Sequence, residues 1–451
     1  MSEMEIFSLT RQHPLPDGEA RVLGAFDTVT PACVLLELSG RSVLVDCGCD
    51  PGGPMRPPEG AAEADALVLT HGHLDHVGGV PGLLAAGFAG PIVATKATLA
   101  IARIVLKDGL RLGGASDRDI RAFIAAFDRL ARPAPYSVPA PLDRGGQLTA
   151  TLEEAGHIIG SASAEVRSLG SRVIVSGDLG RPDSPALRDF HTAWAADRPV
   201  DLVLVESTYG DRVHQRDRAE LTDELLAVIE HALEDGGHIL VPAFAVGRTQ
   251  ALLYHLDALV ESGRLRGLPV ALDSPMGIRA TETYGAFRAL LDEESLEKLS
   301  RGDDPFDFDG LYAVRKGRDS ERVRRHEQPM LIIAGSGMCT GGRIIEHLIE
   351  LLPRPETDLL FVGFQARGTL GRELLDLAAR DGVGHESVRI KGRDVPVNAQ
   401  IKALHGLSAH ADRDELTAWL RAIPEVKRVG LYHGERAAQE ALVEALTPRP
   451  V

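Results

Sequence analysis

The 451-residue sequence predicts an α/β protein built from layered sheets and helices. Short apolar runs alternate with longer helical patterns along nearly the whole chain, without internal repeats or low-complexity stretches. Each apolar run ends at polar or glycine residues, which is where α/β folds place their chemistry. A composition of 44% hydrophobic and 25% charged residues excludes a collagen-like or disordered chain. No apolar stretch approaches the roughly 18 residues that a membrane helix needs.

The apolar runs that we predict as buried strands are short, rich in Val, Leu and Ile, and bounded by turn residues. In chain order they are RSVLVDCG (41–48), DALVLTHGH (65–73), RVIVSGD (172–178), DLVLVEST (201–208), GHILVPAFA (237–245), QPMLIIAGSG (328–337), DLLFVGF (358–364) and KRVGLYHGE (427–435). Helical periodicity predicts helices over 115–131, 219–235, 247–263, 342–352, 369–379, 412–422 and 435–446. The proline-rich stretch Arg132–Pro141 is predicted as a rigid, extended connector.

Charge and cysteine content narrow the functional classes. Lys and Arg number 49 against 65 Asp and Glu, a formal net charge of −16, so any nucleic acid must be held locally rather than by a global positive field. The start of the sequence, MSEMEIFSLTRQHP, lacks the features of a secretory signal, and we expect a cytoplasmic protein with no membrane partner. Cys33, Cys47, Cys49 and Cys339 fit neither a disulfide framework nor a structural zinc site, and are expected to be buried small hydrophobes.

The most informative segment is HGHLDH, residues 71–76, directly after the strand-like run ALVLT. It places His71, His73, Asp75 and His76 within six residues of a strand end, where they can point at one small volume. Packing in an apolar core does not explain so many polar groups in one place, because burying them without partners costs free energy. Zinc prefers neutral imidazole nitrogen and carboxylate oxygen, so the segment predicts a metal site. Six residues cannot saturate two metals, so further ligands must come from elsewhere.

Further candidate ligands stand at other predicted strand ends. His157 lies in EEAGHIIGSAS, Asp178 ends VIVSGD, and His433 ends VGLYHGE in the same way. An ionised carboxylate at a buried strand end needs a metal, backbone N–H groups or a cation to offset its desolvation. Taken singly, each of the three residues would more often be a hydrogen-bonded structural residue. Taken with HGHLDH, they are the expected completion of a metal site.

These motifs resemble known families. HGHLDH with VDCG, AGHIIGSAS and SGD resembles the metallo-β-lactamase superfamily, which implies a four-layer αββα sandwich with a dinuclear metal site. ESTYG, PAFAVGRTQ, LDSPM, IAGSGMCTGGR, GFQARGTLGR, GLSAHAD and YHGE resemble the β-CASP branch, whose members cut nucleic acid; the match is to the compact prokaryotic relatives of the cleavage and polyadenylation endonuclease. The resemblance implies a metallo-β-lactamase domain over 1–205 and 396–451, a β-CASP domain inserted at 206–395, and a cleft between them above the metals.

The resemblance also implies a ligand set for two zinc ions. The first ion would lie on His71, His73 and His157, the second on Asp75, His76 and His433, with Asp178 bridging both. Asp46, in VLVDCG, would orient a ligand imidazole by accepting its other N–H, although a structural strand-end carboxylate is an alternative. Manganese or iron suits the same ligands.

The expected chemistry is hydrolysis of a phosphodiester by a hydroxide held between the two metals. His410 of GLSAHAD would be the general acid for the leaving oxygen, with Glu206 of ESTYG as its orienting carboxylate. The catalytic set then comprises His410, Glu206, Asp178 and Asp75.

Phosphate contacts are predicted with less support from the residues themselves. Ser408 would face the scissile phosphate, or else be the N-cap of the helix at DRDELTAWL. Ser336 and Gly337 belong to GSGMCTGGR, whose N–H groups could form an anion nest between a strand and a helix. This loop does not fit G-x-G-x-x-G, which argues against a nucleotide cofactor. Arg248 and Arg367 are phosphate candidates, with surface arginine as the alternative.

The predicted function is a zinc-dependent ribonuclease, endonucleolytic and also capable of 5′ exonuclease activity, acting on single-stranded RNA. His433 decides for RNA, because a His in YHGE resembles the RNA-cutting members of the branch. The alternatives are a DNA nuclease, a small-molecule hydrolase of the thioesterase or lactamase type, and a non-catalytic RNA-binding subunit. The roughly 190-residue insert is as large as an ordinary domain. It argues against the small-molecule hydrolase, because a small substrate has no need of so large an insert. Homodimerisation is suggested by the resemblance alone.

Overall fold

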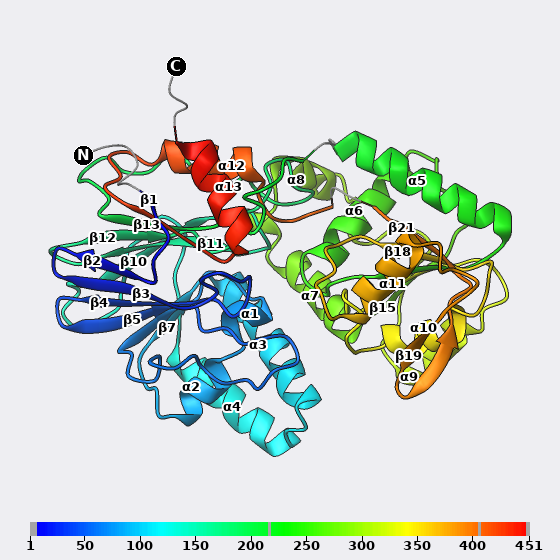
Figure 1. The fold of residues 1–451 in the computed structure, drawn as a ribbon, viewed down its shortest axis with the longest axis horizontal. Helices are drawn as coiled ribbons and strands as arrows, with labels where there is room; N and C mark the ends of the chain where they lie inside the picture. Colours follow the sequence, from blue (N-terminus) through cyan, green and yellow to red (C-terminus); the bar gives the residue numbers. More distant parts are fainter. Residues whose placement is uncertain (1–6, 215–217, 405–406, 448–451) are drawn as a thin grey trace. The chain divides into compact units, whose positions relative to one another are not determined.

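The computed structural model describes residues 7–214, 218–404 and 407–447. The chain divides into two compact units, the first made of residues 1–214 and 409–451 and the second of residues 215–408 (Figure 1). The second unit is thus an insertion into the first. The sequence-based domain limits, after residues 205 and 395, stay predictions.

The first unit contains two seven-stranded sheets. The order in one sheet is β1 (Phe7–Ser8), β22 (Val429–Tyr432), β13 (Leu202–Glu206), β12 (Arg172–Val175), β11 (Ala162–Arg167), β10 (Thr149–Glu154) and β9 (Ala140–Pro141). The order in the other is β2 (Gln12–Leu15), β3 (Gly18–Gly24), β4 (Cys33–Leu38), β5 (Arg41–Val45), β6 (Ala66–Val68), β7 (Ile92–Ala94) and β8 (Ala131–Pro133). Strands β12, β13 and β22 run parallel, as do β5 to β8.

The two sheets pack face to face through one apolar core. Leu36 and Val45 from one sheet and Leu152 and Val173 from the other are among its fully buried members. Strand β13 is apolar at every position from Leu202 to Val205, because it is covered on both faces: alternate residues enter the core between the sheets and the core beneath the helices. This explains why the sequence shows a continuous apolar run there.

Helices cover the outer faces of both sheets (Figure 1). Helices α12 (Arg413–Ala422) and α13 (Arg436–Leu446) lie on one side, where Trp419 is fully buried against strand residues. On the other side are α1 (Leu74–Val77), α2 (Val80–Ala85), α3 (Lys96–Leu112) and α4 (Asp117–Leu130). The predicted four-layer αββα sandwich is therefore confirmed.

The second unit is built on a six-stranded parallel sheet. Its order is β16 (Leu311–Ala313), β15 (Val270–Asp273), β17 (Leu331–Ala334), β14 (Ile239–Pro242), β18 (Asp358–Phe361) and β21 (Gln400–Ala403), and β19 (Ser387–Ile390) pairs with β20 (Arg393–Pro396) as a hairpin. Its helices are α5 (Arg218–Asp235), α6 (Arg248–Glu261), α7 (Pro275–Ala286), α8 (Glu293–Ser300), α9 (Gly317–Arg324), α10 (Ile344–Leu351) and α11 (Leu370–Ala379), with a 3-10 turn at Arg288–Leu290.

The predicted elements are largely confirmed. Every predicted strand and every predicted helix is present, with ends shifted by a few residues. The stretch Arg132–Pro141, predicted as an extended connector, pairs at its two ends into β8 and β9. All four cysteines are buried and free, as expected. Across the part of the chain that the structure describes, no helix is both long and apolar enough to cross a membrane.

Candidate metal centre

The polar residues of the first unit gather where its strands end. Asp46 follows β5, residues 71–76 follow β6, His157 follows β10, Asp178 follows β12, Glu206 is the last residue of β13, and His433 follows β22. Asp46 and His433 have left-handed backbone conformations, with φ of 61° and 51°. This conformation is uncommon outside glycine and, at two strand ends of the same site, it marks backbone that the surrounding structure holds in place.

A first group of ligand atoms comes from His71, His73, His157 and Asp178, and all four atoms lie within 4.8 Å of one another. His73 Nδ1 lies 3.1 Å from His71 Nε2 and 3.3 Å from His157 Nε2. Asp178 Oδ2 is 3.6 Å from Nε2 of both His71 and His157.

A second group comes from Asp75, His76 and His433. The Nε2 atoms of His76 and His433 lie 3.3 Å apart, and His433 Nε2 is 3.7 Å from Asp75 Oδ2. Asp178 touches this group as well, because its Oδ1 is 3.2 Å from His76 Nε2. One carboxylate therefore faces both groups, one oxygen to each.

These residues fit divalent metal. Imidazole nitrogens that bind one zinc ion at about 2.0–2.1 Å in tetrahedral geometry are separated by about 3.3 Å, close to the spacing seen here. Burial lowers the pKa of both His71 and His157 well below the ordinary value, which keeps them in the neutral form that metals bind. Asp178 Oδ1 is buried and accepts no hydrogen bond from any described residue. A cation would satisfy it.

Hydrogen bonds behind the cluster fix the ligand side chains. Asp46 accepts from the backbone N–H of Thr70 (2.8 Å), from its hydroxyl (2.7 Å) and from His76 Nδ1 (2.7 Å). With the proton of His76 on Nδ1, its Nε2 lone pair points into the cluster. The Thr208 hydroxyl holds His433 in a similar way, since it donates to His433 O at 3.0 Å and lies 3.2 Å from Nδ1.

His410 stands beside the first group with a carboxylate behind it. Its Nδ1 is 3.2 Å from Glu206 Oε1, and its Nε2 is 4.0 Å from Asp178 Oδ2. Glu206 is fully buried, and it accepts N–H bonds from Leu179 (2.9 Å) and Thr208 (3.0 Å). Burial opposes a charge on His410, but Glu206, together with Asp178 and Asp75, outweighs it and raises the pKa of His410 above the ordinary value. An imidazole held in this way suits proton donation.

Sequence reasoning missed several residues that support this centre. Thr70 directly precedes HGHLDH, and Thr208 lies in ESTYG, which was singled out for Glu206. The Ser161 hydroxyl accepts from the N–H groups of His157 and Ile158. His214 Nε2 lies 3.0 Å from His410 O, and the His214 N–H donates to Asp412. The hydroxyls could have been found as companions of the ligands, whereas nothing in the sequence around His214 pointed to His410.

The predicted phosphate contacts lie in the second unit. Ser336 and Gly337 follow β17, and the N–H groups of Ser336, Cys339 and Thr340 donate within their own loop, so they are not donors for an anion. Arg248 begins α6, and Arg367 is exposed after β18. Ser408 is half-buried. The alternative that Ser408 caps the following helix is wrong, because the N-cap is Asp412.

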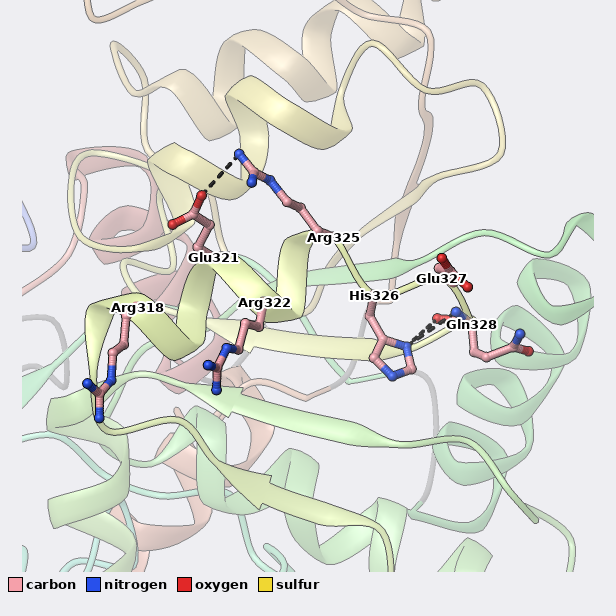
Figure 2. Close-up of a pocket in the computed structure, with 7 residues that line it drawn as sticks. All are labelled: Arg318, Glu321, Arg322, Arg325, His326, Glu327 and Gln328. Atoms are coloured by element: carbon pink, nitrogen blue, oxygen red, sulfur yellow. Dashed lines mark hydrogen bonds and ion pairs between the residues drawn. The ribbon is translucent and has the colours of Figure 1, made fainter.

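The second unit also has a surface groove along α9 (Figure 2). Its lining is Arg318, Glu321, Arg322, Arg325, His326, Glu327 and Gln328. The arginines have carboxylates close by: Arg325 lies 3.0 Å from Glu321, and Arg322 lies 3.7 Å from Asp319. The groove is therefore largely balanced in charge.

Glu154 sits at the end of β10, before the turn that carries His157. Desolvation of this half-buried side chain raises its pKa to about 7 from a usual 4.5, although Oε1 accepts an N–H bond from Gly156 (3.2 Å). Between these two values the folded state holds a proton that the unfolded state has lost, so this contribution to stability falls as the pH rises from about 4.5 through 7. We expect Glu154→Gln to remove a pH-dependent loss of at most about 3 kcal/mol in the free energy of unfolding.

The measurement is the denaturant midpoint of wild type and Glu154→Gln between pH 5 and 9. Metal ligands titrate identically in both proteins, so the difference between the two isolates Glu154. The exposed Glu59 provides a control variant, Glu59→Gln, which should follow wild type. Parallel curves for wild type and Glu154→Gln would contradict the prediction.

Comparison with known proteins agrees with this geometry. Residues 27–243 match the metallo-β-lactamase superfamily, residues 249–374 match the Beta-Casp domain, and residues 394–449 match the Zn-dependent metallo-hydrolase RNA specificity domain. The chain belongs to the metallo-β-lactamase superfamily. Within that superfamily it carries the Beta-Casp domain, as the sequence motifs predicted.

Among its relatives, a ribonuclease of Thermus thermophilus is 39% identical, over 94% of this chain and 95% of the relative. Transcription termination factor FttA of Cenarchaeum symbiosum is 31% identical, over 94% of this chain and 67% of its own length. An RNase J-like protein of Methanocaldococcus jannaschii is 28% identical, over 92% of this chain and 91% of the relative. A crystal structure of a protein of unknown function from Enterococcus faecalis shares the fold, with a TM-score of 0.50 at 13% identity over 94% of each chain.

Proposed function

We propose that this protein is a metal-dependent ribonuclease that hydrolyses phosphodiester bonds of single-stranded RNA, as an endonuclease with additional 5′ exonuclease activity. The observation that carries the proposal is the position of Asp178, between two groups of histidines, all but His73 buried, and 4.0 Å from the His410 ring that Glu206 supports. The family membership and the names of the relatives support RNA as the substrate.

Two zinc ions per chain would occupy the two ligand groups. His71, His73 and His157 would hold one ion, Asp75, His76 and His433 the other, and Asp178 would give one carboxylate oxygen to each. Asp46 keeps the His76 ring in the tautomer that binding requires. Manganese and iron are the other ions that this ligand set accepts. Direct metal analysis of the purified protein identifies the ion.

Ions bound there would supply a water molecule of lowered pKa and positive charge to offset the negative charge that develops on the phosphoryl oxygens. The chain itself supplies the proton for the leaving oxygen. His410 carries that proton on Nε2, on the side that faces Asp178, while Nδ1 donates to Glu206. Glu206 cannot turn away, because two backbone N–H groups hold its oxygens. His410 becomes neutral as the ribose hydroxyl departs.

The test incubates the purified protein, with zinc quantified, against matched 5′-labelled single-stranded RNA and DNA. We expect cleavage of RNA that requires the metal and does not occur with DNA. Cleavage of DNA alone would replace this proposal by a DNA nuclease. Two bound ions without cleavage of either polymer would favour a small-molecule hydrolase. The cytoplasmic location and the homodimer stay predictions from the sequence.

His433→Ala should selectively lower the occupancy of one metal site. His433 contacts His76 and Asp75 of the second group, whereas the first group keeps all of its own ligand atoms. Metal analysis after dialysis should therefore give about one ion per chain, by the loss of one ligand set. His385→Ala, which changes an exposed histidine of the second unit, is the matched control. Two tightly held ions in His433→Ala would contradict the assignment.

A further inference from the structure

Two exposed phenylalanines follow neighbouring strands of the second unit's sheet. Phe244 comes two residues after β14 and is 40% exposed, and Phe364 comes three residues after β18 and is 45% exposed. These strands are parallel neighbours, with Ile239 opposite Asp358. Parallel neighbours end at the same edge of a sheet, so both rings lie at that edge. Among the described residues, Tyr312 is the other large aromatic side chain with comparable exposure.

The loop that carries Phe244 and the loop that carries Phe364 both contact Gly337. A Cβ on Gly337 would lie 2.8 Å from Phe244 Cδ2 and from the Phe244 backbone nitrogen, so only glycine fits against this ring. Gln365, the neighbour of Phe364, is buried and donates from Nε2 to Gly337 O at 2.9 Å and to Gly363 O at 3.2 Å. Both rings therefore belong to one ordered cluster of loops around the Gly335–Gly337 turn.

Two arginines lie close to the loop that carries Phe364. A Cβ on Gly363 would lie 3.6 Å from Arg248 Nε, and the exposed Arg367 follows Phe364 by three residues. Docking sites for protein partners are marked by contiguous apolar patches, whereas the residues next to Phe244 and Phe364 include glycines and two arginines. Exposed aromatic faces beside arginines are instead what proteins use to bind unpaired bases of single-stranded nucleic acid.

We propose that Phe244 and Phe364 form a base-stacking platform that takes unpaired bases of an RNA strand. This inference rests on the proposed function and adds how the strand is recognised. Every base has a π-face, so the platform tolerates sequence changes, but a base inside a duplex has both faces covered. The two rings thereby favour single-stranded over double-stranded RNA.

The test measures the binding of a fluorescein-labelled 12-nucleotide single-stranded oligoadenylate to the metal-loaded protein. Phe244→Ala and Phe364→Ala are made in a His410→Ala background, so that the RNA stays intact. Each is expected to raise Kd about 5- to 150-fold. Phe244→Trp and Phe364→Trp, which keep an aromatic face at each position, should bind RNA like the reference protein. Tyr312→Ala is the matched control, since Tyr312 is 58% exposed on β16, the edge strand at the far end of the sheet order.

Oligoadenylates with abasic sites separate stacking from a structural effect. Abasic sites at the bound positions should weaken binding to the reference protein, which carries His410→Ala alone. They should have little further effect on the double alanine variant, which carries Phe244→Ala and Phe364→Ala together in that background. An equal loss in both proteins, or alanine variants that bind like the reference, would overturn the platform. If the wild type cleaves RNA while the platform variants bind normally, only the platform fails; if the wild type neither binds nor cleaves RNA, both proposals fail.

Discussion

Asp178→Ala is expected to release both metal ions and to reduce RNA cleavage to background. Asp178 is 2% exposed and contacts every histidine group of the centre. Its neighbours within 4.0 Å are His71, His76, His157, His410 and His433. Without this carboxylate, two divalent cations would share a small buried volume with one fewer negative charge between them. Neither ion would then be held tightly.

The measurement is metal stoichiometry after dialysis, together with cleavage of 5′-labelled RNA. Asp178→Asn keeps the shape of the side chain and removes only its charge, so it should lose metal as well. Asp128→Ala, at an exposed position on α4, is the matched control and should keep both ions and full activity. Retention of two ions by both Asp178 variants would show that this carboxylate does not bridge the metals.

The sequence predicted well that these histidines and carboxylates lie together, because they stand in short motifs at strand ends. HGHLDH needs only one strand and one turn to place its ligands, and His157, Asp178 and His433 follow other strands that share the same edge. The supporting groups were harder to predict. The contact of His214 with His410 joins residues 196 positions apart, and no local pattern of residues encodes it.

Exposure was the other property that the sequence did not show. PAFAV and FVGF belong to apolar runs that predict burial, yet β14 ends at Pro242 and β18 ends at Phe361, so Phe244 and Phe364 fall outside the sheet.

Helix α3 was also missed. Its apolar residues are close to continuous at KATLAIARIVL, a pattern in which helix and strand are difficult to distinguish, although Thr95 supplies an N-cap.

His410→Ala should keep both metals and the fold but slow RNA cleavage by about 10²–10⁴-fold, the usual contribution of a general acid. The ligand atoms of both groups have their contacts without His410, whose Nε2 stays 4.0 Å from Asp178. The loss should therefore appear in kcat rather than in metal content. Equal metal loss in His410→Ala and Asp178→Ala would contradict this division of roles.

A phosphodiester with a p-nitrophenolate leaving group provides the sharpest control for His410. A ribose oxygen departs as a strongly basic alkoxide unless it receives a proton, whereas p-nitrophenolate departs without one. If His410 donates the proton, His410→Ala will be slow on RNA and close to wild type on the activated ester. If His410 instead positions the attacking water or the metals, both substrates will slow by the same factor. The contact between Glu206 and His410 Nδ1 leaves Nε2 as the donor, and this favours the first outcome.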